Sequence, residues 1–236
     1  MYGTAANGIN NSGVVVGNGF IYNGTTSTFS DLNDPNGVNN TSAYGINNSG
    51  VVVGTYTDSN GKNNGFIYDG TTFSDLNDPN AVNGTFANGI NNSGVVVGYY
   101  YDSGYNYHGF IYDGTTFSDL NDPNGVNGTF ANGINDNGDV IGYYYDSGSN
   151  SHGFIYNGTT FTDFNDPNGA HSTYANGING NGVVVGYYND NNNSGFIATP
   201  SAAPPANVPF EFSPEQGFML GIPLFIGLRY LKKKRA

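Results

Sequence analysis

The side chains best suited to chemistry in this 236-residue chain are tyrosines that occur in runs. Runs lie at 99–101, 143–145 and 187–188, and two more tyrosines follow the first run. A tyrosine ring has an apolar face and a polar tip, so it can stack on a sugar ring. In a strand, alternate side chains point to opposite faces, so core packing is the default interpretation. The alternative is a glycan-binding rim, whose candidates are Tyr101, Tyr105, Tyr107 and Tyr145.

Loops rich in Asp and Asn suggest calcium, which prefers carboxylate and amide oxygens. The sequence Asp-Leu/Phe-Asn-Asp-Pro-Asn starts at Asp31, Asp75, Asp119 and Asp163, and another such loop spans Asn135–Asp139. Neither matches an EF-hand, because proline stands fifth in the first and no glutamate closes either. Asp and Asn are also ordinary turn formers. We therefore expect no cofactor, with calcium as a minor alternative.

Residues for catalysis are sparse. His108 and His152 occupy the same repeat position and His171 another, so no third metal ligand falls at a suitable spacing. Glutamate occurs only at Glu211 and Glu215, and a Gly-x-Ser-x-Gly motif is absent. The paired carboxylates of a glycosidase would have to come from repeated turns. We expect a non-enzymatic protein with no catalytic residues and no metal site.

These residues lie in a repeat. Gly-Ile-Asn begins at Gly8, Gly45, Gly89, Gly133 and Gly177, and Gly-Phe-Ile follows in register at Gly19, Gly65, Gly109, Gly153 and Gly195. A fixed period of about 40–45 residues that encodes only strands is typical of propeller blades. The unit from Thr85 to Gly128 predicts strands over 85–90, 95–101, 108–112 and 115–120, with a two-residue hairpin at Asp113-Gly114.

Residues 1–199 therefore predict an all-β fold, a β-propeller of about five four-stranded blades. The fifth unit lacks its last strand and the first lacks a loop. We favour a five-bladed ring with imperfect closure. An open arc, or a ring completed by residues upstream, is the alternative.

Charge is strongly partitioned. The net charge is −12, and Lys62 is the only Lys or Arg before Arg229, against sixteen Asp. Such a surface repels nucleic acid and anionic lipid. It is compatible with export and with neutral glycans. Cysteine is absent, so thiols give no information on the compartment.

The repeat resembles a known family. Ala-Asn-Gly-Ile-Asn-Asn-Ser-Gly-Val-Val-Val-Gly-Tyr-Tyr, followed by His-Gly-Phe-Ile-Tyr-Asp-Gly-Thr-Thr-Phe, is similar to the HAF-type extracellular repeat. The resemblance covers roughly residues 1–198, and the His-x-Phe core appears at His108 and His152. It implies export in bacteria and carries no catalytic activity.

The composition changes at Pro200. Residues 200–213 predict an extended Pro/Ala-rich linker. An apolar run over 217–228 then predicts a C-terminal hydrophobic helix, shorter than the ~20 residues of a full transmembrane span. A basic cluster follows and predicts a cytoplasmic stop, with the residues Arg229, Lys232, Lys233, Lys234 and Arg235.

Residues 214–236 resemble a PEP-CTERM sorting signal, with Val208–Pro214 as in cyanobacterial members. The motif is Pro214, Glu215 and Gln216, and Gln216 departs from the expected second proline. The resemblance implies transient anchoring in the inner membrane and cleavage by an exosortase-type membrane protease. Release to the cell surface or to an extracellular polysaccharide matrix would follow. A plain anchor that is never cut is the alternative.

Export also needs a leader, and Met1 is not followed by the regions of a signal peptide. We therefore expect the true start to lie upstream, or the gene to be a truncated copy. Three functional hypotheses follow. The first is an exported structural or interaction protein, the second a lectin-like propeller, and the third, which we favour least, a polysaccharide-active hydrolase.

The tail generates the first testable prediction. Intact-mass analysis of the protein from fractionated host cells should find, in the matrix or surface fraction, a form that lacks the segment beyond Pro214–Gln216. An uncut membrane-bound form would identify a plain anchor. An uncut soluble form inside the cell would contradict export.

Overall fold

The computed structural model describes residues 5–38, 40–166, 172–189 and 193–200. Within these ranges the regular structure is entirely β-strand, and no helix there is long and apolar enough to cross a membrane. The linker over 200–213 is described only at Pro200. The predicted sorting motif, hydrophobic helix and basic cluster lie outside the described residues.

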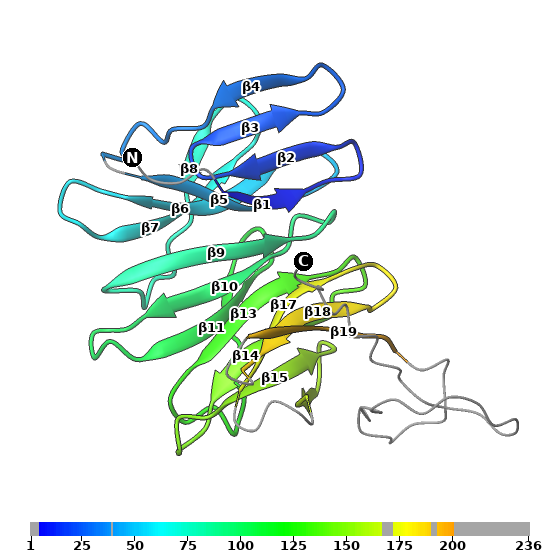
Figure 1. Ribbon diagram of the computed structural model, residues 1–236. Coiled ribbons are helices and arrows are strands. Elements are labelled where there is room, and N and C mark those ends of the chain that lie inside the picture. Colours follow the sequence, from blue (N-terminus) through cyan, green and yellow to red (C-terminus); the bar gives the residue numbers. More distant parts are fainter. Residues whose placement is uncertain (1–4, 39, 167–171, 190–192, 201–236) are drawn as a thin grey trace, which may run out of the picture.

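The strands form successive antiparallel meanders, each corresponding to one sequence repeat (Figure 1). We call each meander a blade. The first blade comprises β1 (Ala6–Ile9), β2 (Val14–Gly17), β3 (Phe20–Asn23) and β4 (Thr28–Asp31). The second comprises β5 (Thr41–Ile46), β6 (Val52–Thr57), β7 (Asn63–Tyr68) and β8 (Phe73–Asp75). The third comprises β9 (Gly84–Ile90), β10 (Val96–Tyr101), β11 (Tyr107–Tyr112) and β12 (Phe117–Asp119).

The fourth blade comprises β13 (Thr129–Ile134), β14 (Val140–Tyr145), β15 (Ser151–Tyr156) and β16 (Phe161–Phe164). The fifth has β17 (Thr173–Ile178), β18 (Val184–Tyr188) and β19 (Ser194–Ala198). The predicted all-β fold of four-stranded sheets is therefore confirmed, as is the missing last strand of the fifth unit within the described residues. One parallel pair, Asn63 with Gly84, joins the second and third blades into a single eight-stranded sheet.

One predicted turn is wrong. Residues 113–114 do not form a two-residue hairpin, because Tyr112 pairs with Phe117 and leaves a four-residue loop. The Asp113 carboxylate accepts hydrogen bonds from the backbone N–H groups of Thr115 and Thr116, both at 2.8 Å. Only Gly114 takes a positive φ, 100°. The backbone N–H of Asp113 also donates to the Thr116 oxygen at 3.2 Å, so the side chain and the backbone of Asp113 close the turn together.

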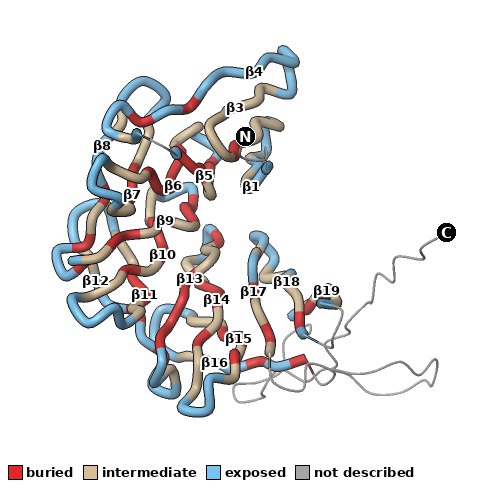
Figure 2. Tube along the Cα trace, turned by 60° about the vertical axis from the view of Figure 1, so that its left-hand side comes forward, coloured by how far each residue is buried: buried red, intermediate tan, exposed pale blue. Residues whose placement is uncertain are grey.

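The core lies between blades. Val53 of β6 packs with Ala87 and Ile90 of β9, and the same pattern recurs at the next two junctions. A blade cannot bury both faces alone, so its neighbours supply the missing contacts. Figure 2 shows the blades following one another around an arc, with buried residues on the strands and exposed residues on the loops.

The arc does not close into a ring. Ile9 of β1 is 68% exposed and Val185 of β18 is 45% exposed, although both sit at positions that other blades bury. The favoured expectation of a five-bladed ring is thus corrected to an open, propeller-like arc. The physical reason is that the first blade does not pack against the fifth, so Ile9 and Val185 stay uncovered.

A glycine near the start of each second strand is required by packing. A Cβ on Gly98 would overlap the backbone oxygen of Phe86 and come within 2.9 Å of the Phe110 ring. We expect Gly98→Ala to lower the free energy of unfolding by about 1–3 kcal/mol, because backbone cannot move aside. Chemical denaturation would measure this loss.

Gly180→Ala is the matched control, since a Cβ there meets nothing within 4 Å. It should change stability by less than about 1 kcal/mol. Equal losses in the two variants would contradict the packing explanation.

Candidate functional site

An aromatic column runs through the junctions of the third, fourth and fifth blades. Its rings alternate between stacked and edge-on contacts, with centroids 4.7–4.9 Å apart. The members pair across the first and second strands of each blade, as the register of Phe86 with Tyr99 illustrates. In chain order the column is Phe86, Tyr99, Phe130, Tyr143, Tyr174 and Tyr187.

The candidate tyrosines border this column at the loop end of the blades. Tyr101 and Tyr107 pair across β10 and β11, with ring centroids 4.6 Å apart. Tyr107 also lies 4.6 Å from Phe130, and Tyr145 lies 5.7 Å from the same ring. Buried Phe130 therefore links tyrosines of the third blade to Tyr145 of the fourth.

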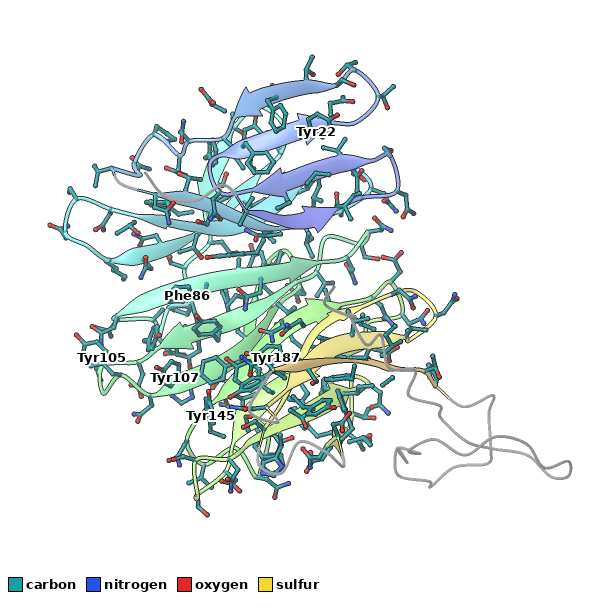
Figure 3. All side chains as sticks on the ribbon, in the orientation of Figure 1. Tyr22, Phe86, Tyr105, Tyr107, Tyr145 and Tyr187 are labelled. Atoms are coloured by element: carbon teal, nitrogen blue, oxygen red, sulfur yellow. The ribbon has the colours of Figure 1, made fainter. Side chains whose placement is uncertain are left out.

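Figure 3 shows Tyr105 and Tyr107 at the loop end of β10 and β11, with Phe86 nearby and Tyr145 and Tyr187 continuing across the next blades. We call Tyr101, Tyr105, Tyr107 and Tyr145 the tyrosine rim. Tyr101, Tyr107 and Tyr145 are half-buried, whereas Tyr105 is 69% exposed. The rim thus offers ring surface to solvent above a packed aromatic support.

Asp102 builds the loop that carries Tyr105. Its carboxylate accepts hydrogen bonds from the backbone N–H groups of Gly104 and Asn106, at 2.7 and 2.9 Å. Hydrogen bonds from the side chain and backbone of Asn106 lower the pKa of Asp102 to about 2. The carboxylate is therefore ionised at neutral pH and holds the loop closed.

The same loop recurs in neighbouring blades, on Asp58 and Asp146. Its tip residue has a left-handed backbone, which only glycine adopts without strain. The tip is Gly61 in the second blade, with φ 82°, and Ser149 in the fourth, with φ 63°. In the third blade it is Tyr105, with φ 62°. A bulky residue in this conformation is unusual, and strain of this kind concentrates at functional sites.

The hydroxyls of Tyr101 and Tyr145 stay protonated near neutral pH. Burial, followed by the neighbouring hydroxyl of Tyr107, raises the pKa of Tyr101 to about 12. Burial and then the hydroxyl of Tyr174 likewise raise the pKa of Tyr145 to about 12. Each can therefore donate a hydrogen bond.

The second tyrosine of each predicted run is a core residue. Tyr100, Tyr144 and Tyr188 are 3–4% exposed. The expectation that part of each run faces inward is confirmed. Phe86, Phe130 and Tyr174 were missed by sequence reasoning, although each stands at the same place in the first strand of its repeat.

His108 and His152 have structural partners, and His171 lies outside the described residues. The His108 ring stacks on Tyr100 at 5.0 Å, and its Nε2 lies 3.3 Å from an Asp102 oxygen. His152 repeats this arrangement on Tyr144 and Asp146. In the part of the chain that the structure describes, no three His, Asp or Glu side chains gather as a metal site would require. Calcium binding stays a prediction.

A second set of polar groups is buried in the linkers between blades. Asp34, Asp78 and Asp122 are 2–4% exposed, and burial raises the pKa of each. Nearby, Tyr144 donates a hydrogen bond to Asp163 at 2.8 Å, and Asn124 lies 3.4 Å from the same oxygen. Asp122 Oδ2 has no hydrogen-bond partner among the described residues. The charge of Asp163, which is itself exposed, adds to the raised pKa of Asp122.

Comparisons with known proteins give a partial match. Residues 20–123 match a family model described as "Protein of unknown function (DUF3466)". No curated protein matches the chain. The HAF and PEP-CTERM resemblances stay predictions.

Among solved structures, a fucose lectin from Kordia zhangzhouensis in complex with methyl-fucoside is 15% identical, with a TM-score of 0.35. The match covers 52% of this chain and 96% of that lectin. An Aleuria aurantia lectin mutant in complex with Fucalpha1-6GlcNAc is 13% identical, with a TM-score of 0.47, covering 83% of this chain and 73% of the lectin. The fucosides are ligands of those lectins, and these identities and TM-scores do not extend them to this chain.

The buried carboxyls predict a pH dependence. The pKa of Asp122 is raised to about 6 from 3.8. Its protonated form therefore stabilises the fold below pH 3.8, and that contribution is lost as the pH rises through about 6. Asp122→Asn should raise the free energy of unfolding at pH 7, by at most about 3 kcal/mol, with little effect near pH 4. Denaturation across this pH range would measure it.

Asp113→Asn is a control for which the change in stability with pH should have the opposite sign. Hydrogen bonds from the Thr116 and Thr115 groups lower the pKa of Asp113, so its ionised form stabilises the fold above pH 3.8 and the contribution is lost in acid. This variant should be less stable than the wild type at pH 7. Identical pH profiles for Asp122→Asn and the wild type would contradict the assignment.

Proposed function

We propose that this chain is a non-enzymatic, carbohydrate-binding protein whose tyrosine rim contacts a neutral polysaccharide. The observation that carries the proposal is Tyr105, a bulky aromatic residue that is 69% exposed at a left-handed loop tip. Packing does not require a tyrosine there, because Gly61 and Ser149 occupy the same tip in neighbouring blades. Contact with a ligand would explain why a strained, exposed tyrosine stands at this position.

The chemistry of the rim suits sugar rings. An aromatic face can cover the C–H face of a sugar, while the hydroxyl reaches its polar edge. Tyr101 and Tyr107 are already held by neighbouring rings 4.6 Å away, so binding costs them little rotamer freedom. Rigid tyrosines of this kind are effective contact residues.

Charge favours a neutral ligand. The residues before the tail carry sixteen Asp and one Lys, and Asp102 lies directly beneath the rim loop. Like charges across an interface cost affinity, so a uronate-rich polysaccharide or a nucleic acid is disfavoured.

Burial supports a non-enzymatic role. A glycosidase needs two carboxyl groups that flank the scissile bond. The carboxyl groups whose pKa burial raises, Asp34, Asp78 and Asp122, are 2–4% exposed in the linkers between blades and so lie out of reach of a polymer.

The tail favours a location for this activity. Its resemblance to a sorting signal supports export, exosortase-type processing and residence at the cell surface or in the polysaccharide matrix. A purely structural role in that matrix is the second candidate, and loss of the rim tyrosines would not affect it.

Binding to immobilised polysaccharides tests the proposal, with dextran, mannan and galactan as neutral probes and polygalacturonate as an anionic one. The wild type should bind at least one neutral probe more tightly than polygalacturonate. Tyr105→Ser and Tyr107→Ser, which copy the fourth-blade residues Ser149 and Ser151, should each weaken binding by roughly tenfold.

Phe29→Ser is the matched control, because Phe29 is also 69% exposed but lies on β4, away from the rim. It should leave binding unchanged. Equal binding by the rim variants and the wild type would contradict the proposal and favour the purely structural role. Release of reducing ends from a probe would identify an enzyme.

A further inference from the structure

The two ends of the arc expose the two complementary faces that meet at each internal junction between blades. At each internal junction, an apolar residue of a second strand packs on the first strand of the next blade. The residues are Val16, Val53, Val97 and Ile141, and each is 0% exposed. Their contacts in the next blade are an alanine and an isoleucine, such as Ala43 and Ile46.

Directional hydrogen bonds accompany this apolar contact. Asn47 donates from its side chain to the backbone oxygen of Asn91 at 3.2 Å, and Asn91 donates likewise to Asn135. Asn88 donates to the oxygen of Ala131 at 2.9 Å, and Asn132 to that of Ala175 at 2.7 Å. In every case the donor side chain belongs to the earlier blade and the acceptor to the later one.

The fifth blade presents the donor half without a described partner. Val185 stands at the position of Val53 and Val97 but is 45% exposed. Asn176 and Asn179 stand where the donating asparagines stand, and both are exposed. A Cβ on Gly89 would lie 3.1 Å from Gly133 of the next blade, whereas on Gly177 it would meet only Val185 of its own blade.

The first blade presents the acceptor half. Ile9 is 68% exposed, whereas Ile46 and Ile90 at the same position are 9% exposed. Ala6 is exposed where Ala43 is fully buried. The first blade therefore leaves open the alanine and isoleucine that the second strand of a preceding blade would cover.

We propose that these faces join two copies of this chain head to tail, with the fifth blade of one copy against the first blade of the other. The partner is a second copy because the interface requires the repeat's own residues at matched positions. The named residues of both faces are uncharged, so two acidic chains can meet there without direct repulsion. Such a heterologous contact builds larger rings or filaments.

In the described part of the chain Ile9 and Val185 are both exposed, so neither face covers the other, and the proposal places the contact between copies. This inference is independent of the proposed function. It would add avidity by placing several tyrosine rims on one assembly.

Disulfide trapping tests the proposal, since the chain contains no cysteine. Full-length Ile9→Cys and Val185→Cys proteins are mixed under mild oxidation and separated without reductant. We expect a mixed disulfide-linked dimer of one copy of each, formed well above the like-with-like dimers. Val126→Cys replaces either partner as the control, because Val126 is 71% exposed in a linker away from both faces.

Three results would overturn the proposal. Formation of the mixed dimer no faster than dimers with the Val126→Cys control would indicate random collision. Predominance of like-with-like dimers would indicate a two-fold contact. A disulfide formed only within one chain of the double variant Ile9→Cys/Val185→Cys would show that the arc closes on itself.

A non-covalent measurement separates association from folding. Val185→Glu should lower the association constant in analytical ultracentrifugation at least tenfold while the unfolding midpoint and the polysaccharide binding of a single copy stay unchanged. A Val185→Glu protein that associates like the wild type would also overturn the proposal.

Discussion

Everything in this structure depends on how closely the innermost strands of consecutive blades approach. A Cβ on Gly45 would lie 3.3 Å from the Cα of Gly89, and a Cβ on Gly89 would lie 3.1 Å from the Cα of Gly133. Larger residues at these positions would force the blades apart. Because the backbones meet here, the valine beside each glycine reaches the next blade and is fully buried. The glycine of the Gly-Ile-Asn triplet is therefore required by packing at these junctions.

Because the blades are held together by this close approach, the side chains on the loops can vary without affecting the packing. The loop built on Asp58, Asp102 or Asp146 keeps the same backbone and the same carboxylate hydrogen bonds in three blades. Only its substituents change, and Tyr105 and Tyr107 replace smaller residues in one blade alone. A scaffold fixed by glycine and asparagine can thus carry a variable surface without losing its packing.

The sequence predicts the elements better than their long-range contacts. The strand expected over 95–101 is observed as β10, and the second tyrosine of each run is buried as alternation requires. The turn predicted at Asp113-Gly114 is wrong in length, because the Asp113 carboxylate and its backbone N–H both hydrogen-bond within a four-residue loop. The meeting of Tyr107 and Tyr145 at Phe130 was not predicted, since it joins different blades. Closure could not be inferred either, because it depends on the rotation between blades and not on any one residue.

The aromatic column is confined to certain blades, which bears on the kind of ligand under the proposed function. In the second blade, the positions of Phe86 and Tyr99 are taken by Ser42 and Thr55, both buried. The Thr55 hydroxyl has no hydrogen-bond partner among the described residues, which is a cost that an aromatic pair would avoid. The column is therefore not a by-product of the repeat but a feature of the third to fifth blades. A binding site repeated in every blade would suit separate small sugars. Under the proposed function, a rim supported by one continuous aromatic column suits an extended polymer, which can contact several rim tyrosines at once.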